Sequence, residues 1–183
     1  MDVAYDEAKF TELLLYVADR LRDDQAGGAT KLNKVVYFAE FAHVRRHGAP
    51  ISGCEFKKLR QGPAPRRLLP VRDRMVEAGE AELRTVDFLG WQQHRLVPLR
   101  PADTGVFSAE ELQTIDDVLE QLRDLTARQV SDLSHEDPGW ELTEMGETIP
   151  YGAALLGGKQ TSTPTSRRLS REVADRYGIP LPG

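Results

Sequence analysis

The chain has 183 residues, of which 40% are hydrophobic and 29% charged, and its formal net charge is −5. This composition is typical of a folded domain and too apolar for a disordered chain. No apolar run approaches the roughly 20 residues of a membrane helix, and the acidic start lacks the basic region of a signal peptide. The single cysteine, Cys54, excludes an internal disulfide. We therefore expect a cytoplasmic protein.

Charge is unevenly distributed along the chain. Residues 31–74 carry a net charge of +8, and residues 75–150 carry −12. Such blocks can steer a charged partner toward the protein. They can also face each other and cancel within the fold, and we favour this second interpretation.

Periodic apolar residues predict two helices in the first fifty residues. The first spans about 7–22, with Asp6 as its N-cap and apolar residues at spacings of three and four. The second is capped by Thr30 and stopped by Gly48 and Pro50. Its apolar stripe is widened by aromatic residues, so we expect it to be buried on most sides.

The next fifty residues mix strand and helix signals. We expect a short strand within 51–59, a turn at 61–65, and a third helix over about 67–78 with Pro70 in its first turn. Residues 81–100 predict a β-hairpin with Gly90 in its turn. A lone hairpin is marginal in water, so it must pack on the helices.

Two capping boxes, Ser108 with Glu111 and Thr126 with Gln129, predict the starts of a fourth and a fifth helix. A turn at Pro138-Gly139 and a short helical segment near 151–156 follow. The stretch 157–166 is rich in Gly, Ser and Thr and predicts a flexible linker.

The predicted fold is mainly α. A compact helical domain of residues 1–156 has one small β-hairpin packed on it. The linker 157–166 leads to a C-terminal tail, 167–183, in which Ser170 caps a short helix through Tyr177. A lone helix this short is unstable in water, so we expect it to order only against a partner or a second copy.

Three ordered segments of the chain carry distinctive motifs. The first, TKLNKVVYFAEFAHVRRHGAPI, carries Lys31, Leu32, Lys34, Tyr37 and Phe38. The second, LRQGPAPRRL, centres on Gly62-Pro63, and the third, VSDLSHEDPGWEL, places His135 ahead of Trp140. Together these segments resemble the signature blocks of the Panacea (SocA-like) antitoxin family, although Gln61 stands where family members often have Tyr.

The resemblance implies a helical antitoxin of a type II toxin–antitoxin system. Such a protein binds and neutralises a cognate protein toxin by direct contact, with no catalytic residues and no cofactor. One role in the family is that of a proteolytic adaptor for a Clp-type protease, and a homodimer stays open. The residues of the first and third blocks are then structural.

An alternative is a DNA-binding transcriptional regulator of its own operon, based on the basic block at 31–74. This block lacks the interleaved aromatic residues of a single-strand binder, and the sequence has no finger or basic-zipper pattern. We therefore rank nucleic acid well below a protein partner.

Two histidine motifs could belong to a metal site or a catalytic site, but each lacks the further residues that such a site needs. His43 and His47 are four residues apart, a spacing that can hold a metal, but no further ligands accompany them, so we expect an ordinary helix end. His135 with its acidic neighbours Glu136 and Asp137 would need a nucleophile, for which Cys54 is the only thiol. We expect His135 instead to hydrogen-bond the backbone before Trp140. No catalytic or metal site is predicted.

Two places are candidates for the partner surface. One is the rigid turn at Gly62-Pro63, because a stiff loop loses little entropy on binding and basic residues attract an acidic patch. The other is the tip of the 81–100 hairpin, where apolar residues crowd a turn that should be polar. We prefer the first. The residues concerned are Phe56, Lys57, Arg60, Arg66 and Arg67 around the turn, and Phe88, Leu89 and Trp91 at the tip.

Overall fold

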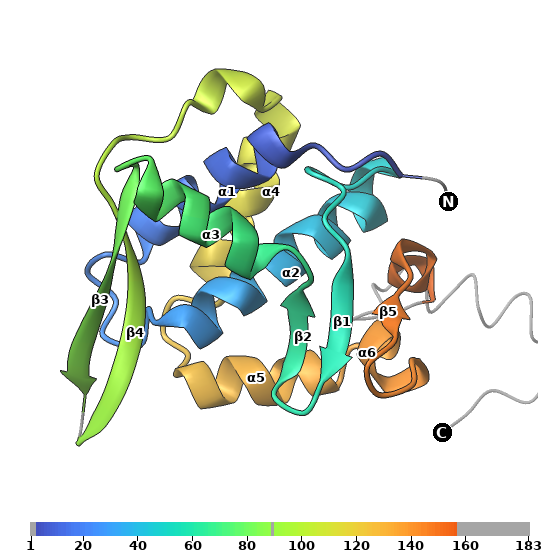
Figure 1. Cartoon of the computed structure of the whole chain (residues 1–183). Helices are drawn as coiled ribbons and strands as arrows, with labels where there is room; N and C mark the ends of the chain where they lie inside the picture. Colours follow the sequence, from blue (N-terminus) through green and yellow to red (C-terminus); the bar gives the residue numbers. More distant parts are fainter. Residues whose placement is uncertain (1–2, 89, 157–183) are drawn as a thin grey trace, which may run out of the picture.

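The computed structural model describes residues 3–88 and 90–156. Its centre is α2 (Ala29–His47), which crosses the middle of the molecule below α1 (Glu7–Arg20) and α4 (Ala109–Gln121) in the view of Figure 1. Apolar side chains of all three helices meet in one cluster, in which Val35 and Val36 are fully buried. The predicted shared core is therefore confirmed.

The helix ends follow the sequence signals with one exception. Asp6 caps α1 by accepting the backbone N–H of Lys9 at 2.9 Å, and Gly48, with φ of +80°, ends α2. Thr30 does not cap α2, because the helix begins earlier: the N–H of Leu32 already bonds to the carbonyl of Gly28, which is the N-cap. The chain enters α2 against the hairpin, where a side chain on Gly28 would collide with Gln93.

A small antiparallel sheet lies beside α2. It contains the strand predicted within 51–59, but its other two strands were not predicted. Its strands are β1 (Phe56–Leu59), β2 (Gly62–Pro65) and β5 (Thr148–Ile149), in the order β2-β1-β5. The segment 61–65 is therefore largely a strand rather than a turn. Both prolines are tolerated because β2 is an edge strand and their nitrogens face away from β1, as expected of residues in non-hydrogen-bonded pairs.

The predicted hairpin and the helix before it are confirmed. Helix α3 (Leu68–Glu77) precedes β3 (Ala81–Phe88) and β4 (Trp91–Pro98), which are joined at Gly90 with φ of +82°. The hairpin packs on α1, α2 and α3, and its tip extends away from the body of the molecule (Figure 1). The predicted packing on the helices is therefore confirmed.

The last part of the described chain wraps around the lower side of α2 in the view of Figure 1. Both capping boxes are formed. The predicted turn at Pro138-Gly139 is instead the first turn of a helix, because Asp137 caps it and Pro138 fits its first position. The elements after α4 are α5 (Ala127–His135), α6 (Pro138–Leu142) and η2 (Tyr151–Leu155), whereas η1 (Thr104–Val106) precedes α4. The predicted linker and tail helix lie outside the described residues.

Candidate partner-binding site

Two buried lysines on α2 bind backbone carbonyls. Lys31 is 1% exposed, and its Nζ donates to the carbonyl oxygens of Arg123 (2.9 Å) and Leu125 (2.7 Å). The same ammonium forms an ion pair with Asp24 at 2.6 Å. A buried charge is costly without such acceptors. Lys31 therefore fastens the start of α2 to the loops that follow α1 and α4.

Lys34 reaches from α2 to the β1–β2 hairpin. It is 2% exposed, and its Nζ donates to the carbonyl oxygen of Pro63 at 2.8 Å. Burial lowers the pKa of this ammonium to about 8. At Gly62, where φ is +92°, an added Cβ would lie 2.8 Å from Lys34 Nζ and 2.4 Å from Ser134 Oγ. Only glycine fits there, so the Gly-Pro motif marks the place where α2, β2 and α5 meet.

Tyr37 joins α2 to the start of α6. Its hydroxyl donates to Asp137 Oδ1 at 2.7 Å, and the same carboxylate oxygen accepts the N–H of Gly139 at 2.9 Å. The ring is fully buried and packs against Phe41 and Phe56. Burial, together with the Asp137 charge, raises the pKa of the Tyr37 hydroxyl, so it stays a proton donor.

Trp140 lies between a histidine and a lysine. The His135 ring stacks on it with centroids 4.2 Å apart, and Lys58 Nζ lies 4.1 Å from its centroid. Two groups this close to the ring centre must occupy opposite faces. The indole N–H donates to the carbonyl oxygen of Leu59 at 3.2 Å. Trp140 therefore ties α6 to β1.

The interaction of His135 differs from the prediction. Its Nε2 is buried and has no hydrogen-bond partner among the described residues, so this nitrogen does not bond the backbone. The ring is held instead by its stack on Trp140. The contact is aromatic because His135 ends α5 while Trp140 lies in the next helix, and the two rings meet face to face.

A groove of about 900 Å³ opens beside Trp140, and we call it the Trp140 groove. Phe38 from α2 and Val118 from α4 contribute apolar walls, and Leu133 from α5 is 40% exposed. The exposed acidic residues Glu136 and Glu141 also line it, and so does the basic residue Arg45. Three of the signature residues thus border one concave surface: Phe38, His135 and Trp140.

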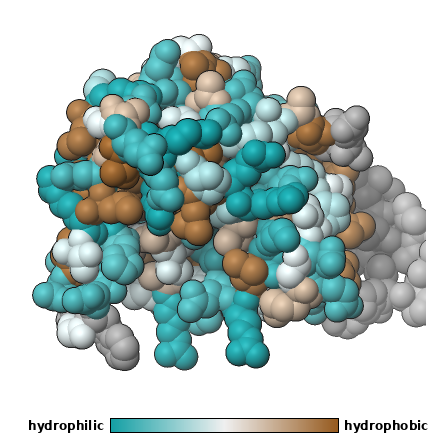
Figure 2. Space-filling view, in the orientation of Figure 1, coloured by the Kyte–Doolittle hydropathy of each residue, from teal (hydrophilic) through white to brown (hydrophobic). Residues whose placement is uncertain are grey.

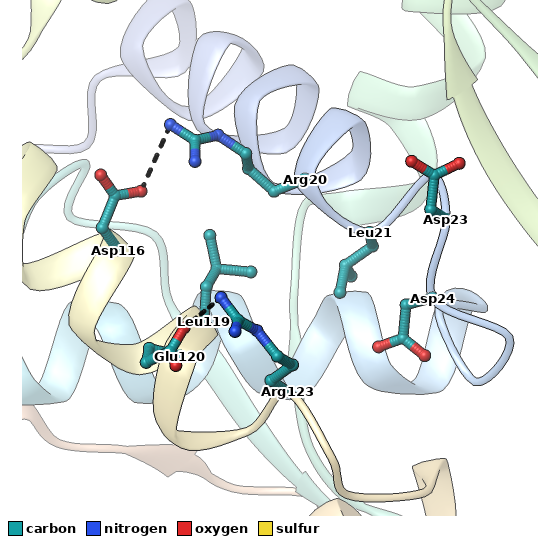
Figure 3. A pocket seen from close by; sticks show the side chains of 8 residues that line it. All are labelled: Arg20, Leu21, Asp23, Asp24, Asp116, Leu119, Glu120 and Arg123. Atoms are coloured by element: carbon teal, nitrogen blue, oxygen red, sulfur yellow. Dashed lines mark ion pairs between the residues drawn. The ribbon is translucent and has the colours of Figure 1, made fainter.

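A second hollow, of about 490 Å³, lies between the ends of α1 and α4 (Figure 3). In it Arg20 forms an ion pair with Asp116 at 3.6 Å, and Arg123 pairs with Glu120. Asp24, on the opposite wall, pairs with Lys31. Because these charges are matched within the wall, we interpret this hollow as paired polar surface.

The contacts described so far join three separate segments: α2, the β1–β2 hairpin, and the stretch from α5 to α6. A family model described as the antitoxin SocA-like Panacea domain matches residues 32–141, more than half of the chain. This chain belongs to the Panacea family. Comparisons with curated proteins and with solved structures gave no match. Membership gives the chain a general antitoxin-like character, and a toxin is the partner that it implies.

The Panacea signature residues largely serve the fold. Lys31, Leu32, Lys34 and Tyr37 are at most 5% exposed, and each contacts an element far away in the sequence or the core. Phe38 and Trp140 are only partly buried and border the groove. Most signature residues are therefore buried in contacts between elements, and Phe38 and Trp140 are the partly exposed ones.

The residues predicted to bind a partner around Gly62-Pro63 are distributed over several environments. Phe56 is fully buried, and Gly62 and Pro63 are buried too. Lys57 is half-buried on β1, while Arg60 is exposed at the tip of the β1–β2 hairpin. Of these five, Lys57 and Arg60 present side chains that a partner can reach.

Arg66 and Arg67 follow β2 and lie at the other end of the same hairpin. Arg66 pairs with Glu55 at 2.7 Å, and the Arg67 guanidinium lies 5.1 Å from the centre of the Tyr5 ring. Strand pairing separates these arginines from Arg60 by the length of the hairpin. The basic segment is therefore two small clusters rather than one patch.

The competing surface is the tip of the β3–β4 hairpin. Phe88 and Trp91 are the last paired residues of the two strands. Leu89 between them lies outside the described residues. The surrounding residues of the tip, Asp87 and Gln92, are exposed.

The side chains considered as catalytic or metal-binding candidates make structural contacts in the fold. Burial raises the pKa of the Cys54 thiol to about 12, so it is not an activated nucleophile. Asp137 is engaged by Tyr37 and by the start of α6. His43 bonds Thr114 through Nδ1 at 3.2 Å and stacks near His47 at the end of α2. Within the described ranges, no group of three or more His, Cys, Asp or Glu is arranged to hold a metal ion.

None of the helices in residues 3–88 and 90–156 has the length and apolarity that a membrane crossing requires.

The Trp140 groove was not predicted from the sequence. Its walls come from α2, α4, α5 and α6, and one local signal was available: Leu133 on a short helix whose neighbours are polar.

Proposed function

We propose that this Panacea protein is an antitoxin that neutralises a cognate protein toxin in the cytosol by direct protein–protein contact. The observation that carries the proposal is the family match over residues 32–141. The site geometry supports it, because the polar signature residues bind one another and the backbone. Polar residues engaged in structural contacts are expected in a protein that acts by binding a partner.

Co-expression tests the proposal. The open reading frame beside this gene should arrest growth when expressed alone, and growth should recover when the present chain is expressed with it. The two purified proteins should also elute together in size-exclusion chromatography. A harmless neighbour, or arrest that persists beside well-folded protein, would contradict an antitoxin function.

We further propose that the antitoxin can act as an adaptor that delivers its toxin to a Clp-type protease. The support is the family resemblance alone. The toxin should then be short-lived in cells that hold both proteins, and its half-life should rise when the protease is removed. A half-life that does not depend on the protease would leave occlusion as the mechanism.

For the partner surface we propose the β1–β2 hairpin, with Arg60 exposed at its tip and Lys57 and Lys58 on β1. The Lys58 ammonium lies over the Trp140 ring. Tryptophan and arginine are the residues that most often dominate binding energy. Positive charge there would speed the approach of an acidic toxin surface. The proposal retains the other predicted basic residues, Arg66 and Arg67, as a second contact region at the far end of the hairpin.

The competing surface is the tip of the β3–β4 hairpin. Figure 2 shows hydrophobic areas on the half of the visible face that holds α3 and this hairpin. Leu69 and Val76 on α3 and Leu83 on β3 are among the exposed apolar residues. Arg60→Glu with Arg66→Glu should abolish rescue if the basic surface binds, and Phe88→Ser with Trp91→Ser should abolish it if the tip does. Rescue by the first variant and failure of the second would assign the partner surface to the tip of the β3–β4 hairpin instead.

Ion pairing favours a protein partner over DNA. In the basic block Arg46 pairs with Asp117, and Arg74 pairs with Glu7. These arginines are partly neutralised within the fold, although only Arg46 pairs with the acidic block 75–150. Phosphate binding depends on available positive charge. A gel shift with the promoter of its own operon at physiological salt tests the regulator alternative. We expect no shift.

A further inference from the structure

We propose that the Trp140 groove is the docking site for segment 167–177 of the same chain. The proposal concerns an intramolecular contact and does not depend on the identity of a toxin. Its components are the groove, the chemistry of the segment, and the length of chain that connects them.

The groove has the features of a site for an amphipathic helix. Its volume of about 900 Å³ accommodates several side chains, and its walls include Phe38, Val118 and Leu133. Leu133 is 40% exposed, so apolar surface is left uncovered by residues 3–88 and 90–156. The exposed carboxylates of Glu136 and Glu141 outnumber the one basic lining residue, Arg45, so the lining is net negative. An occupant should therefore combine apolar and basic side chains.

Segment 167–177 has this combination. Its apolar residues Leu169, Val173 and Tyr177 recur every four positions, which places them on one side of a helix. It holds four arginines, at positions 167, 168, 171 and 176, against the two acidic residues Glu172 and Asp175. The apolar side matches the groove walls, and the net positive charge matches the carboxylates beside them.

The chain between η2 and segment 167–177 is long enough to reach the Trp140 groove, and η2 lies near it. Helix η2 ends the described chain and packs on α2 and α6, two of the elements that line the groove. Ten residues, 157–166, separate Leu156 from the segment on the near side, and they span up to about 33 Å when extended. A short tether also raises the effective concentration of the segment at the groove to about the millimolar range. Weak docking is therefore sufficient for occupancy.

Docking of the segment would make the groove a switchable surface. Any partner that uses the groove has to displace the segment, and a partner that binds elsewhere leaves it in place. The sequence alone suggests that the tail needs a partner or a second copy in order to fold. The groove offers the required surface within one molecule.

Amide hydrogen exchange on the full-length protein tests the contact. We expect residues 171–177 to exchange at least ten times more slowly than an unstructured peptide. Leu133→Glu should remove this protection, and Leu83→Glu, which changes a leucine 46% exposed on the hairpin, should preserve it. Val173→Glu alters the segment itself and cannot unfold the described domain, so it should also remove the protection. Exchange at the unstructured rate in the unmodified protein, or unchanged protection in Leu133→Glu, would overturn the proposal.

Disulfide trapping identifies the occupant. A variant with Leu133→Cys and Val173→Cys should form a bond within one chain under mild oxidation, at a rate independent of protein concentration. The matched control combines Val173→Cys with Leu69→Cys, a leucine 58% exposed on α3 that does not line the groove, and should react at least ten times more slowly. Covalent dimers that increase with concentration would assign the groove to a second copy and overturn the proposal, as would equal rates for the two variants.

Discussion

Single side chains decide how closely the three Panacea segments approach. Lys34 spans the gap between α2 and β2, and Gly62 allows that gap to be small. The sequence motif identified both residues without revealing that they touch. Their contact is long-range, and no spacing rule along the chain predicts it.

Gly62→Ala should destabilise the protein by about 3 kcal/mol or more, because it adds a steric clash with Ser134 to an unfavourable positive φ. Gly48→Ala is the matched control. It shares a positive φ of +80°, but nothing lies within 4 Å of its added Cβ, so its cost should be about 1–2 kcal/mol. Urea denaturation of both variants measures the difference, and equal losses would show that Gly62 is needed for its φ alone.

Lys34 should make stability depend on pH in the alkaline range. Its pKa is about 8 in the folded protein and near 10.5 in the unfolded chain. Between these values the unfolded chain binds more protons, so this group makes the free energy of unfolding rise with pH. The free energy of unfolding of the unmodified protein minus that of Lys34→Met should increase by roughly 1–3 kcal/mol from pH 7.5 to 10. The subtraction cancels the titration of Cys54 and the tyrosines, and a flat difference would contradict the shift.

At the scale of elements, prediction succeeded where the signal is local. The capping boxes at Ser108 and Thr126 start α4 and α5 as expected, because a cap and its partner are three residues apart. Prediction from the sequence was wrong for β2 and for the start of α6, both of which were expected to be turns. Gly-Pro and Pro-Gly are typical of turns, but pairing with β1 and the cap from Asp137 made one a strand and the other a helix.

The hydrogen bond between Tyr37 and Asp137 couples two elements, and its strength can be measured. Tyr37→Phe should cost about 1–3 kcal/mol of stability because it leaves a buried carboxylate oxygen with one donor fewer. Asp137→Ala removes the acceptor together with the N-cap of α6, and the cycle subtracts the cost of the lost cap. A double-mutant cycle of the two changes should give a coupling energy of about 1 kcal/mol or more. Additive effects in thermal or urea denaturation would show that the bond contributes nothing.

For the whole molecule, the sequence indicated a central helical core and a basic region, and the structure refines both. The core is shared by α1, α2 and α4 as expected. The predicted basic surface is divided because β1 and β2 pair along their length and separate Arg60 from Arg66. The Trp140 groove was not predicted, since its walls come from four helices whose packing no single stretch of sequence determines, and Leu133 was the one local signal.

The shared core gives a prediction about global stability. Val36→Asp would place an unpaired charge at a fully buried position on α2 and should cost several kcal/mol, more than about 3. Val106→Asp, at a valine that is 37% exposed on η1, should change the free energy of unfolding by less than about 0.5 kcal/mol. Thermal unfolding followed by circular dichroism distinguishes the two. Equal melting temperatures would mean that α2 is not central.

The two prolines of β2 have a consequence for self-assembly. An open strand edge normally offers a row of N–H donors to which another chain can add a strand. Pro63 and Pro65 lack those donors on the outer side of β2, and the outward carbonyl of Pro63 is already taken by Lys34. Sheet growth on this side is therefore blocked by the same residues that define the family motif. Copies of the protein can therefore accumulate without polymerising through this edge.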